Sequence, residues 1–387
     1  MHTSTMHRSA YAGLALVTSA FLLASCQNPD SRPEEETSAA APESSAPQSA
    51  TSSTSATTQE TTETSAAEHE GARATAEGHV VVLSTGGTIA STHDKTGAVV
   101  PTVTGSKLVE PLSDTFDNNK LTLEVKDIAK LDSSAMTLDD TDSIITAVNK
   151  ELRRDDVDGV VVTHGTDSME ETAIAVDTFQ DSEKPVALTG AMRPFDDPNP
   201  DGPDNLALAV KTVTDPANRG RGTFIAFADQ VIPARGAFKS DTSKADGFAN
   251  NNGEKQPQRP KALKFKPLGN TRVDIIAAYP GAPADLIQRS LDSGAEGIVI
   301  EGMGAGNIGD ELAQAAKAAA KKVPVVLTTR VDHGPVEGIY GGAGGGATLA
   351  DAGVISSGTL RAPQARMLLA AAITTDTDPA ELFPDAD

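Results

Sequence analysis

Two short motifs place hydroxyl and carboxylate side chains directly after apolar segments of the chain. The first is TGGT at Thr85–Thr88, which follows the run HVVVLS, and the second is HGTD at His164–Asp167, which follows GVVVT. Paired glycines let backbone N–H groups approach a ligand closely, and a hydroxyl follows at once. That combination is suited to an oxyanion or a carboxylate. A threonine hydroxyl is a weak nucleophile, so any attack on a carbonyl would need a neighbouring base.

Lys239 and Asp167 are the charged residues that could complete such a site. A lysine acts as a base only where burial or nearby cations lower its pKa, and Lys239 lies in the segment ARGAFKSDTSKADGF. Most lysines, however, are solvated surface charges. Asp167 stands directly before a predicted helix, where an aspartate commonly caps the helix. On residue type and spacing alone, both residues keep a purely structural interpretation.

The sequence around these motifs predicts alternating strands and helices. Apolar runs at His79–Ala90, Gly159–Ser168, Pro185–Arg193 and Gly222–Gln230 each lead into a polar loop, as buried parallel strands do. Between two of them, MEETAIAVDTF places its apolar residues on one helical face, and Ser168 and Glu171 have the spacing of a capping box. Since ligands gather at the carboxyl ends of parallel strands, both motifs are expected at one sheet edge.

A second, shorter series of strands and helices begins near Thr271. It runs through DIIAAY, a helix from Ala284, GIVIEGM, a helix from Asp310, VPVVLTTR and GVISS. We therefore predict an α/β protein with a larger N-terminal domain, whose mainly parallel sheet is flanked by helices, and a smaller C-terminal α/β domain. The predicted bounds are 79–246 for the larger domain, 247–270 for a linker rich in Asn, Gly, Pro and Lys, and 271–387 for the smaller domain.

The N-terminus is typical of an exported lipoprotein. His7 and Arg8 precede an apolar run that is too short to span a membrane, and the run ends in LASC at the only cysteine, Cys26. We predict a signal peptide over 1–25 and a lipid anchor on Cys26 at the outer face of a bacterial cell membrane, from which the domain could be shed. An ordinary signal peptide with an incidental cysteine is the alternative. No intramolecular disulfide is possible with a single cysteine.

Residues 26–78 are predicted to be a disordered tether. From residue 27 to residue 78 there is no Leu, Ile, Val, Met or aromatic residue, and Ser, Thr, Pro, Glu and Ala dominate. Such a segment cannot bury enough apolar surface to fold. As a flexible chain it would span about 40 Å, and its acidic charge would extend it further. An O-glycosylated stalk would have the same physical consequence.

Charge and histidine spacing exclude two classes of ligand. The chain carries 32 basic and 54 acidic residues, a formal net charge of −22, and no basic run, which argues against a nucleic-acid partner. His93, His164 and His333 lack the paired spacing of a metal site, so no metal is expected.

Four motifs together resemble the bacterial type II L-asparaginases and glutaminase-asparaginases. They are TGGTIA, THGTDSMEETA, TGAMRP followed by DGPDNL, and the late SSGTL, and the resemblance extends from about Val80 to about Phe383. TGGTI and HGTD in this order, each ending a strand, form a specific signal. The resemblance implies an enzyme without a cofactor, acting on a small-molecule amide and built of intimate homodimers paired into homotetramers.

The resemblance also implies roles for individual residues. Thr88 matches the threonine that attacks the side-chain amide, beside Gly87 of the glycine pair. Thr166, Asp167 and Lys239 match a second set, in which the lysine polarises the threonine and the aspartate holds the α-amino group. The remaining matches are substrate-binding positions: Ser133, which faces the α-carboxylate, Ser134, where a glutamine is common, and Asn307 of the smaller domain.

Two activating groups of that family have no counterpart here. Ala90–Gly105 contains no tyrosine, and Pro101 falls near the position where one is expected. The stretch Ile339–Leu349 has no acid at the point where a neighbouring subunit would supply a glutamate. We hypothesise that Tyr340 or Lys239 assists Thr88 instead.

The function predicted from this resemblance is hydrolysis of L-asparagine to L-aspartate and ammonia through a threonine acyl-enzyme. L-glutamine hydrolysis, as a side activity or as the preferred reaction, differs by one methylene and is left open by the sequence. A tRNA-dependent amidotransferase subunit is opposed by the export signal. A lipid-anchored amino-acid binding protein without catalysis is the alternative from another class.

Overall fold

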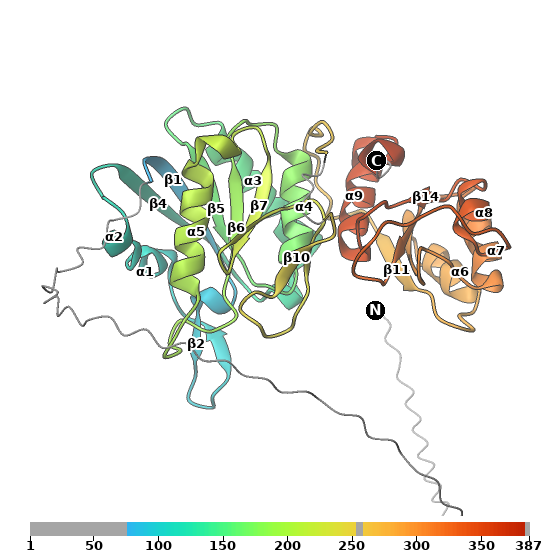
Figure 1. Cartoon of the computed structure of the whole chain (residues 1–387), viewed down its shortest axis with the longest axis horizontal. Helices are drawn as coiled ribbons and strands as arrows, with labels where there is room; N and C mark the ends of the chain where they lie inside the picture. The colour runs from blue at the N-terminus through green and yellow to red at the C-terminus, as the bar shows by residue number, and fades with distance from the viewer. Residues whose placement is uncertain (1–75, 253–257, 384–387) are drawn as a thin grey trace, which may run out of the picture. The chain divides into compact units, whose positions relative to one another are not determined.

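The larger of the two main sheets carries the segments that bear both motifs. The computed structural model describes residues 76–252 and 258–383, and Figure 1 shows the arrangement of their elements. The strand order is β4-β1-β5-β6-β7-β8, in which β8 is antiparallel to β7 and the other neighbouring strands are parallel. The strands are β1 (Gly78–Gly86), β4 (Leu121–Leu131), β5 (Gly159–Thr163), β6 (Val186–Thr189), β7 (Thr223–Phe227) and β8 (Gln230–Pro233). The predicted mainly parallel sheet is confirmed.

Helices cover both faces of this sheet, which explains the continuous apolar runs in its strands. In β1, Val81 and Leu83 join the core cluster beneath α3 and α4, while Val80 and Val82 join a second cluster with residues of α1 and α5. A strand that is buried on both faces favours a continuous run of β-branched residues, in which polar and apolar residues do not alternate. The flanking helices are α1 (Gly105–Val109), α2 (Leu112–Thr115), α3 (Leu138–Leu152), α4 (Met169–Phe179) and α5 (Gly202–Thr214).

The α4 helix begins where the sequence predicts it, but its cap is different. Ser168 occupies the N-cap position without a side-chain capping bond. Its hydroxyl donates instead to the Ser133 carbonyl at 2.7 Å. The predicted capping box of Ser168 is therefore wrong, because a long-range partner competes for the hydroxyl. A capping box does form at α3, between Thr137 and Asp140.

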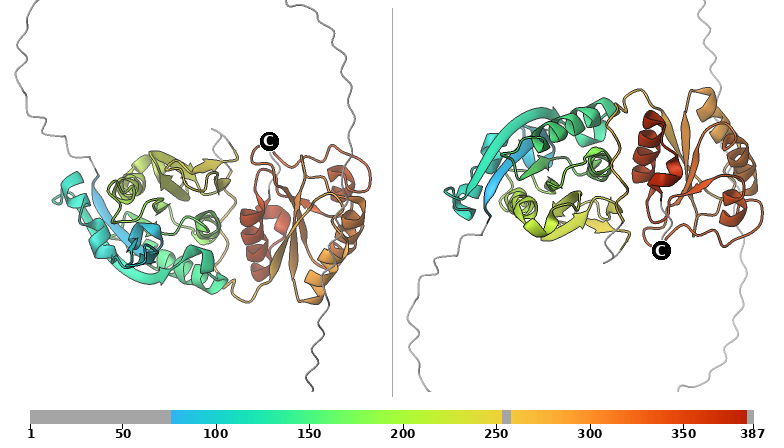
Figure 2. Two further views of the ribbon diagram at one scale, coloured as in Figure 1. Left: turned by 90° about the horizontal axis from the view of Figure 1, so that it is seen from below. Right: turned by 90° about the horizontal axis from the view of Figure 1, so that it is seen from above.

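The second main sheet is smaller and entirely parallel, with the order β11-β12-β13-β14. Figure 2 shows that helices cover both of its faces. Its strands are β11 (Val273–Ala277), β12 (Gly297–Gly302), β13 (Val325–Thr329) and β14 (Ile355–Ser356), and its helices are α6 (Asp285–Asp292), α7 (Asp310–Ala319), α8 (Gly346–Ala350) and α9 (Ala362–Thr375). The predicted smaller C-terminal α/β domain is confirmed.

The α9 helix joins the cores of the two sheets. It packs on α4 and also on β11, β12 and β13. One core cluster accordingly contains Ile174 of α4, Leu368 of α9 and Val299 of β12. Since nine of its residues are buried, α9 has no polar face, and its sequence pattern does not show the amphipathic alternation of a surface helix.

Two small antiparallel hairpins accompany the sheets. One pairs β2 (Ser91–His93) with β3 (Val99–Pro101), and the other pairs β9 (Ala237–Lys239) with β10 (Phe248–Asn250). The β10 strand and the residues from 258 onward fall in the segment predicted as a linker. In that segment Leu263 donates its N–H to the Thr178 carbonyl at 2.9 Å.

Four short 3₁₀ helices complete the described elements: η1 (Thr88–Ala90), η2 (Ser133–Ala135), η3 (Pro216–Asn218) and η4 (Pro379–Leu382). Within residues 76–252 and 258–383, no helix combines the length and apolar character needed to cross a membrane. The predicted signal peptide, Cys26 and most of the tether lie outside the described residues.

Candidate functional site

A cavity of about 210 Å³ lies at the carboxyl ends of β1 and β5. After β1, the next strand of this sheet along the chain is β4, which lies beside β1. The strand that follows it in this sheet, β5, lies on the opposite side of β1. Ligands bind preferentially where the strand order reverses in this way. The cavity is lined by Gly87, Thr88, Ser91, Val99, Pro101, Leu131, Asp132, Ser133, Gly165, Thr166 and Asp167.

The glycine pair after β1 makes room for close backbone packing. Gly86 and Gly87 have φ values of 110° and 79°, in the region that favours glycine. A Cβ atom on Gly87 would lie 2.5 Å from the Cα atom of Gly165, so the TGGT and HGTD loops touch through their glycines. The Thr85 hydroxyl adds a buried bond to the Thr163 carbonyl at 2.7 Å. These contacts bring the two predicted motifs together.

Thr88 is the first residue after this glycine pair. It begins η1, is partly buried and lines the cavity. Gly87 accepts a hydrogen bond from the Ser91 hydroxyl at 2.8 Å, which holds the turn around Thr88. The Thr88 side chain is therefore carried by a hydrogen-bonded turn at the cavity wall.

Lys239 reaches the second motif from β9. Its Nζ atom lies 2.9 Å from Thr166 Oγ1 and 2.7 Å from Asp167 Oδ1. The Lys239 side chain is only 21% exposed, whereas the Asp167 side chain is 56% exposed. Asp167 therefore makes an ion pair with Lys239 instead of capping α4. Lys239 holds one oxygen of this exposed carboxylate, so the other oxygen can still accept a hydrogen bond from a cationic group of a ligand.

Ser133, in η2, contacts the backbone of Asp167. Its hydroxyl oxygen accepts the Asp167 N–H at 3.3 Å, and it is 7% exposed. A Cβ atom on Gly165 would lie 2.3 Å from Ser133 Oγ, so the HGTD glycine is needed for this approach. The cavity floor is thus assembled from η1, η2 and the loop between β5 and α4.

Glu170 is a neighbour of the site that sequence reasoning missed. Its Oε2 atom accepts the Lys239 backbone N–H at 2.5 Å. Burial raises the pKa of the Glu170 carboxyl to about 7, and the like charge of Glu171 acts in the same direction, while Lys239 opposes the shift. The apolar helix pattern gave no signal for this contact, because Lys239 comes from a distant segment.

Asp132 and the β2–β3 hairpin also line the cavity without having been predicted. Asp132 is occupied locally, since its Oδ1 atom accepts bonds from the N–H and the hydroxyl of Ser134. Val99 and Pro101 bring apolar surface from the hairpin. This hairpin is held to the loop after β6 by His93, whose N–H donates to Asp196 Oδ2 at 2.9 Å.

Four predicted residues do not line this cavity. Lys239 contacts two lining residues, Thr166 and Asp167, and the other three are Ser134, Asn307 and Tyr340. Ser134 is exposed and bonds to Asp132, and it is not among the lining residues. Asn307 lies in the loop between β12 and α7, and its buried Oδ1 atom has no hydrogen-bond partner within the described part of the chain. Tyr340, the hypothesised aid to Thr88, has 54% of its surface exposed and does not line the cavity.

His164 plays no part in the cavity wall. It is fully buried, its Nδ1 atom lies 2.7 Å from the Gly165 carbonyl, and burial lowers its pKa to about 4. A neutral imidazole in this position supports the HGTD turn and adds no polar group to the cavity wall.

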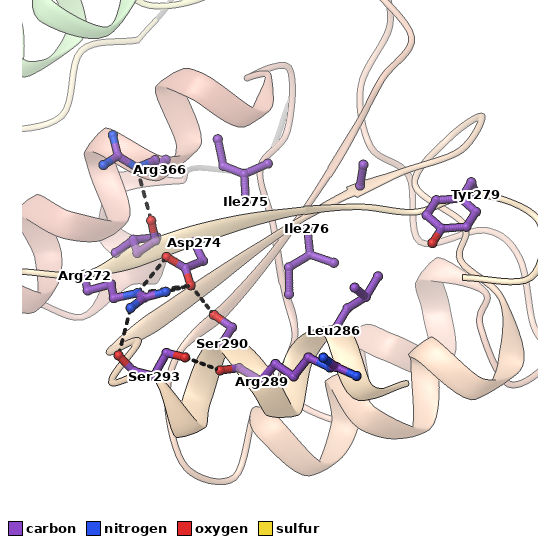
Figure 3. A pocket seen from close by; sticks show the side chains of 12 residues that line it. Arg272, Asp274, Ile275, Ile276, Tyr279, Leu286, Arg289, Ser290, Ser293 and Arg366 are labelled. Atoms are coloured by element: carbon purple, nitrogen blue, oxygen red, sulfur yellow. Dashed lines mark hydrogen bonds and ion pairs between the residues drawn. The ribbon is translucent and has the colours of Figure 1, made fainter. Parts of the chain in front are cut away.

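A larger cavity of about 700 Å³ lies along β11 and α6, but it holds none of the predicted site residues (Figure 3). Its charged groups are paired with protein atoms. Arg272 binds Asp274 at 2.9 Å, and Arg366 Nε donates to the Val273 carbonyl at 3.1 Å. The candidate site is therefore the smaller cavity, whose wall carries hydroxyl and carboxylate groups and where Lys239 pairs with Thr166 and Asp167.

Comparison with known proteins identifies the family. Residues 79–260 match the family model "Asparaginase, N-terminal", and residues 272–383 match "Glutaminase/Asparaginase C-terminal domain". The "L-asparaginase 2" of Bacillus subtilis is 32% identical over 79% of this chain and 84% of its own length. The "L-asparaginase 2" of Escherichia coli is 34% identical over 79% of this chain and 91% of its own. The "Probable L-asparaginase" of Deinococcus radiodurans is 39% identical over 55% of this chain and 70% of its own length. The chain belongs to the asparaginase family.

Proposed function

We propose that this protein hydrolyses L-asparagine to L-aspartate and ammonia through an acyl-enzyme on Thr88. One observation carries the proposal: Thr88, Thr166 and Asp167 line a single small cavity, and Lys239 is hydrogen-bonded to Thr166 and Asp167. Membership of the asparaginase family supports the same reaction.

Substrate binding would use the opposite charges of a free amino acid. The exposed oxygen of Asp167 is suited to the α-ammonium group, because its other oxygen is held by Lys239. Ser133, together with backbone N–H groups of the glycine loops, is suited to the α-carboxylate. We therefore expect a free amino acid to be preferred over a peptide-bound residue.

In the first step the Thr88 oxygen would attack the side-chain amide carbon. The carbon–nitrogen bond breaks, the threonine proton passes to the leaving nitrogen, and ammonia departs from an aspartyl ester. Water then attacks the ester carbon, the bond to the Thr88 oxygen breaks, and a proton from the water passes to that oxygen, which releases L-aspartate. Lys239 polarises the Thr166 hydroxyl, which places positive charge near the oxygen that becomes negative in each step.

L-glutamine would be a second substrate of the same site. It is longer by one methylene, a difference that hydrophobic pockets discriminate by about 1–3 kcal/mol. We further propose, from the family resemblance, that the enzyme assembles as homodimers or homotetramers. From the sequence of the N-terminus we propose export and lipid anchoring through Cys26.

The test is steady-state ammonia release from L-asparagine and L-glutamine by the full chain and by Thr88→Ala. We expect turnover of L-asparagine by the wild type and a loss of at least about 10³-fold in the variant, since nucleophile removal leaves only residual catalysis. Circular dichroism checks that the variant is folded. Unchanged turnover in folded Thr88→Ala would reject the mechanism.

A binding protein without catalysis is the second candidate. The apolar Val99 and Pro101 line the cavity on the hairpin where the family has an activating tyrosine, and this favours the alternative. Calorimetric binding of L-asparagine by the wild type without any ammonia release would support it.

A further inference from the structure

The strand that carries Lys239 is too short to fix its own position. The β9 strand has three residues and pairs only with β10, apart from the two main sheets. Yet Lys239 Nζ must stay within 2.9 Å of Thr166 Oγ1. Contacts outside the hairpin must therefore hold β9 against the start of α4 and the loop before it, which contains Thr166.

Gln364 of α9 supplies one of these contacts. Its side chain is 1% exposed and lies in the first turn of the helix. The Nε2 atom donates to the Ala234 carbonyl at 2.7 Å and to the Glu170 carbonyl at 3.2 Å. The Oε1 atom accepts the Gly236 N–H at 2.8 Å. One amide group thus connects α9, the residues that lead into β9, and the first turn of α4.

Glu170 supplies the second contact, at the other end of β9. Its carboxylate accepts the Lys239 N–H at 2.5 Å. Its own carbonyl is an acceptor for Gln364. The short strand is therefore fixed to the first turn of α4 at both ends, through a side chain of α9 before the strand and through Glu170 at Lys239 itself.

We propose that Gln364, together with Glu170, is a positioning residue for Lys239. Neither group is assigned to contact the substrate, and both act by keeping the lysine ammonium on Thr166. The inference rests on the proposed function, because it assumes that this contact is used in amide hydrolysis. It gives α9, a helix that also packs on the smaller sheet, a positioning role for a site at the edge of the larger sheet.

Gln364→Met tests this role with little change in side-chain volume. The Ala234 carbonyl keeps a second donor, the Ala237 N–H at 3.2 Å, so the main losses are the partner of the Gly236 N–H and the bond to the Glu170 carbonyl. Gln180→Met is the matched control. Gln180 is also a fully buried glutamine, at the far end of α4, and its Oε1 atom accepts the Ser182 N–H.

A second pair of variants tests the Glu170 contact. Glu170→Ala removes the acceptor for the Lys239 N–H, and Glu170→Gln keeps a carbonyl oxygen there. For Gln364→Met and Glu170→Ala we expect kcat for L-asparagine to fall by at least about tenfold, with KM within about threefold, because the contact acts in the chemical step. For Gln180→Met and Glu170→Gln we expect kcat within about twofold of the wild type.

Chemical labelling gives a readout that does not depend on turnover. Reductive methylation of Lys239, followed by peptide mass spectrometry, should be faster in Gln364→Met than in the wild type and in Gln180→Met, because a released lysine becomes accessible. If the wild type releases no ammonia, the proposed function fails, and the labelling rate still tests the positioning contact.

Three results would overturn the inference. They are unchanged kcat and labelling in folded Gln364→Met, an equal fall of kcat in Gln180→Met, and no recovery of kcat in Glu170→Gln relative to Glu170→Ala.

Discussion

The two sides of the cavity are built in different ways. On one side, Thr166, Asp167 and Lys239 form a connected group held by buried elements of the core. On the other side, Thr88 lies near the β2–β3 hairpin, which contributes Ser91, Val99 and Pro101 to the wall and no charged side chain. The difference indicates that the group of Thr166, Asp167 and Lys239 is preorganised, whereas under the proposed mechanism the hairpin supplies no tyrosine for the activation of Thr88.

The largest effect should come from breaking the connected side. In Lys239→Met, kcat should fall by about 10²–10³-fold, since one charge-assisted donor near the developing negative charge is lost. The double variant Lys239→Met with Thr166→Val should be little slower than the more damaging single variant, because residues that act as a unit are not additive. Steady-state ammonia release measures all three. Fully additive losses would show that the two residues act separately.

A smaller effect is expected when the ligand-facing charge on that side is removed. Asp167→Asn keeps the shape of the side chain but loses the charge that we assign to the substrate ammonium. KM for L-asparagine should rise by about 10–100-fold, more than kcat falls, because charged hydrogen bonds contribute about 1.5–3 kcal/mol. A kcat effect with unchanged KM would place Asp167 in the chemistry and not in binding.

The smallest effect should come from the hairpin side. Asp196 holds the hairpin through the N–H and the ring of the half-exposed His93, and exposed contacts of this kind contribute about 1 kcal/mol or less. Asp196→Ala should therefore raise KM by about threefold with kcat nearly unchanged. Asp196→Asn keeps an acceptor for the His93 N–H and serves as the control. A tenfold fall of kcat in Asp196→Ala would mean that the hairpin aligns Thr88.

Much of the fold and part of the site could be predicted from the sequence for a physical reason. Strands buried on both faces leave continuous β-branched runs, and TGGT and HGTD mark their carboxyl ends. Gly87, Thr88, Ser133, Thr166 and Asp167 do line one cavity. The α/β class with a larger and a smaller sheet is likewise confirmed.

The parts that escaped prediction depend on contacts between distant segments. Nothing local to Lys239 reveals that Glu170 accepts its N–H, and nothing in α9 reveals that Gln364 reaches Gly236. The capping box predicted at Ser168 failed for the same reason, since its hydroxyl found the Ser133 carbonyl. Local patterns indicate where elements begin, whereas the tertiary partners of polar side chains are decided by the assembled fold.

The central claim is that the Thr88 oxygen forms an ester with the substrate. Rapid acid quenching during turnover of L-asparagine, followed by peptide mass spectrometry, tests it most directly. We predict an aspartyl adduct on the peptide that contains Thr88 and its absence in Thr88→Ala. Measurable ammonia release with no adduct on that peptide, or with an adduct on another side chain, would contradict the account.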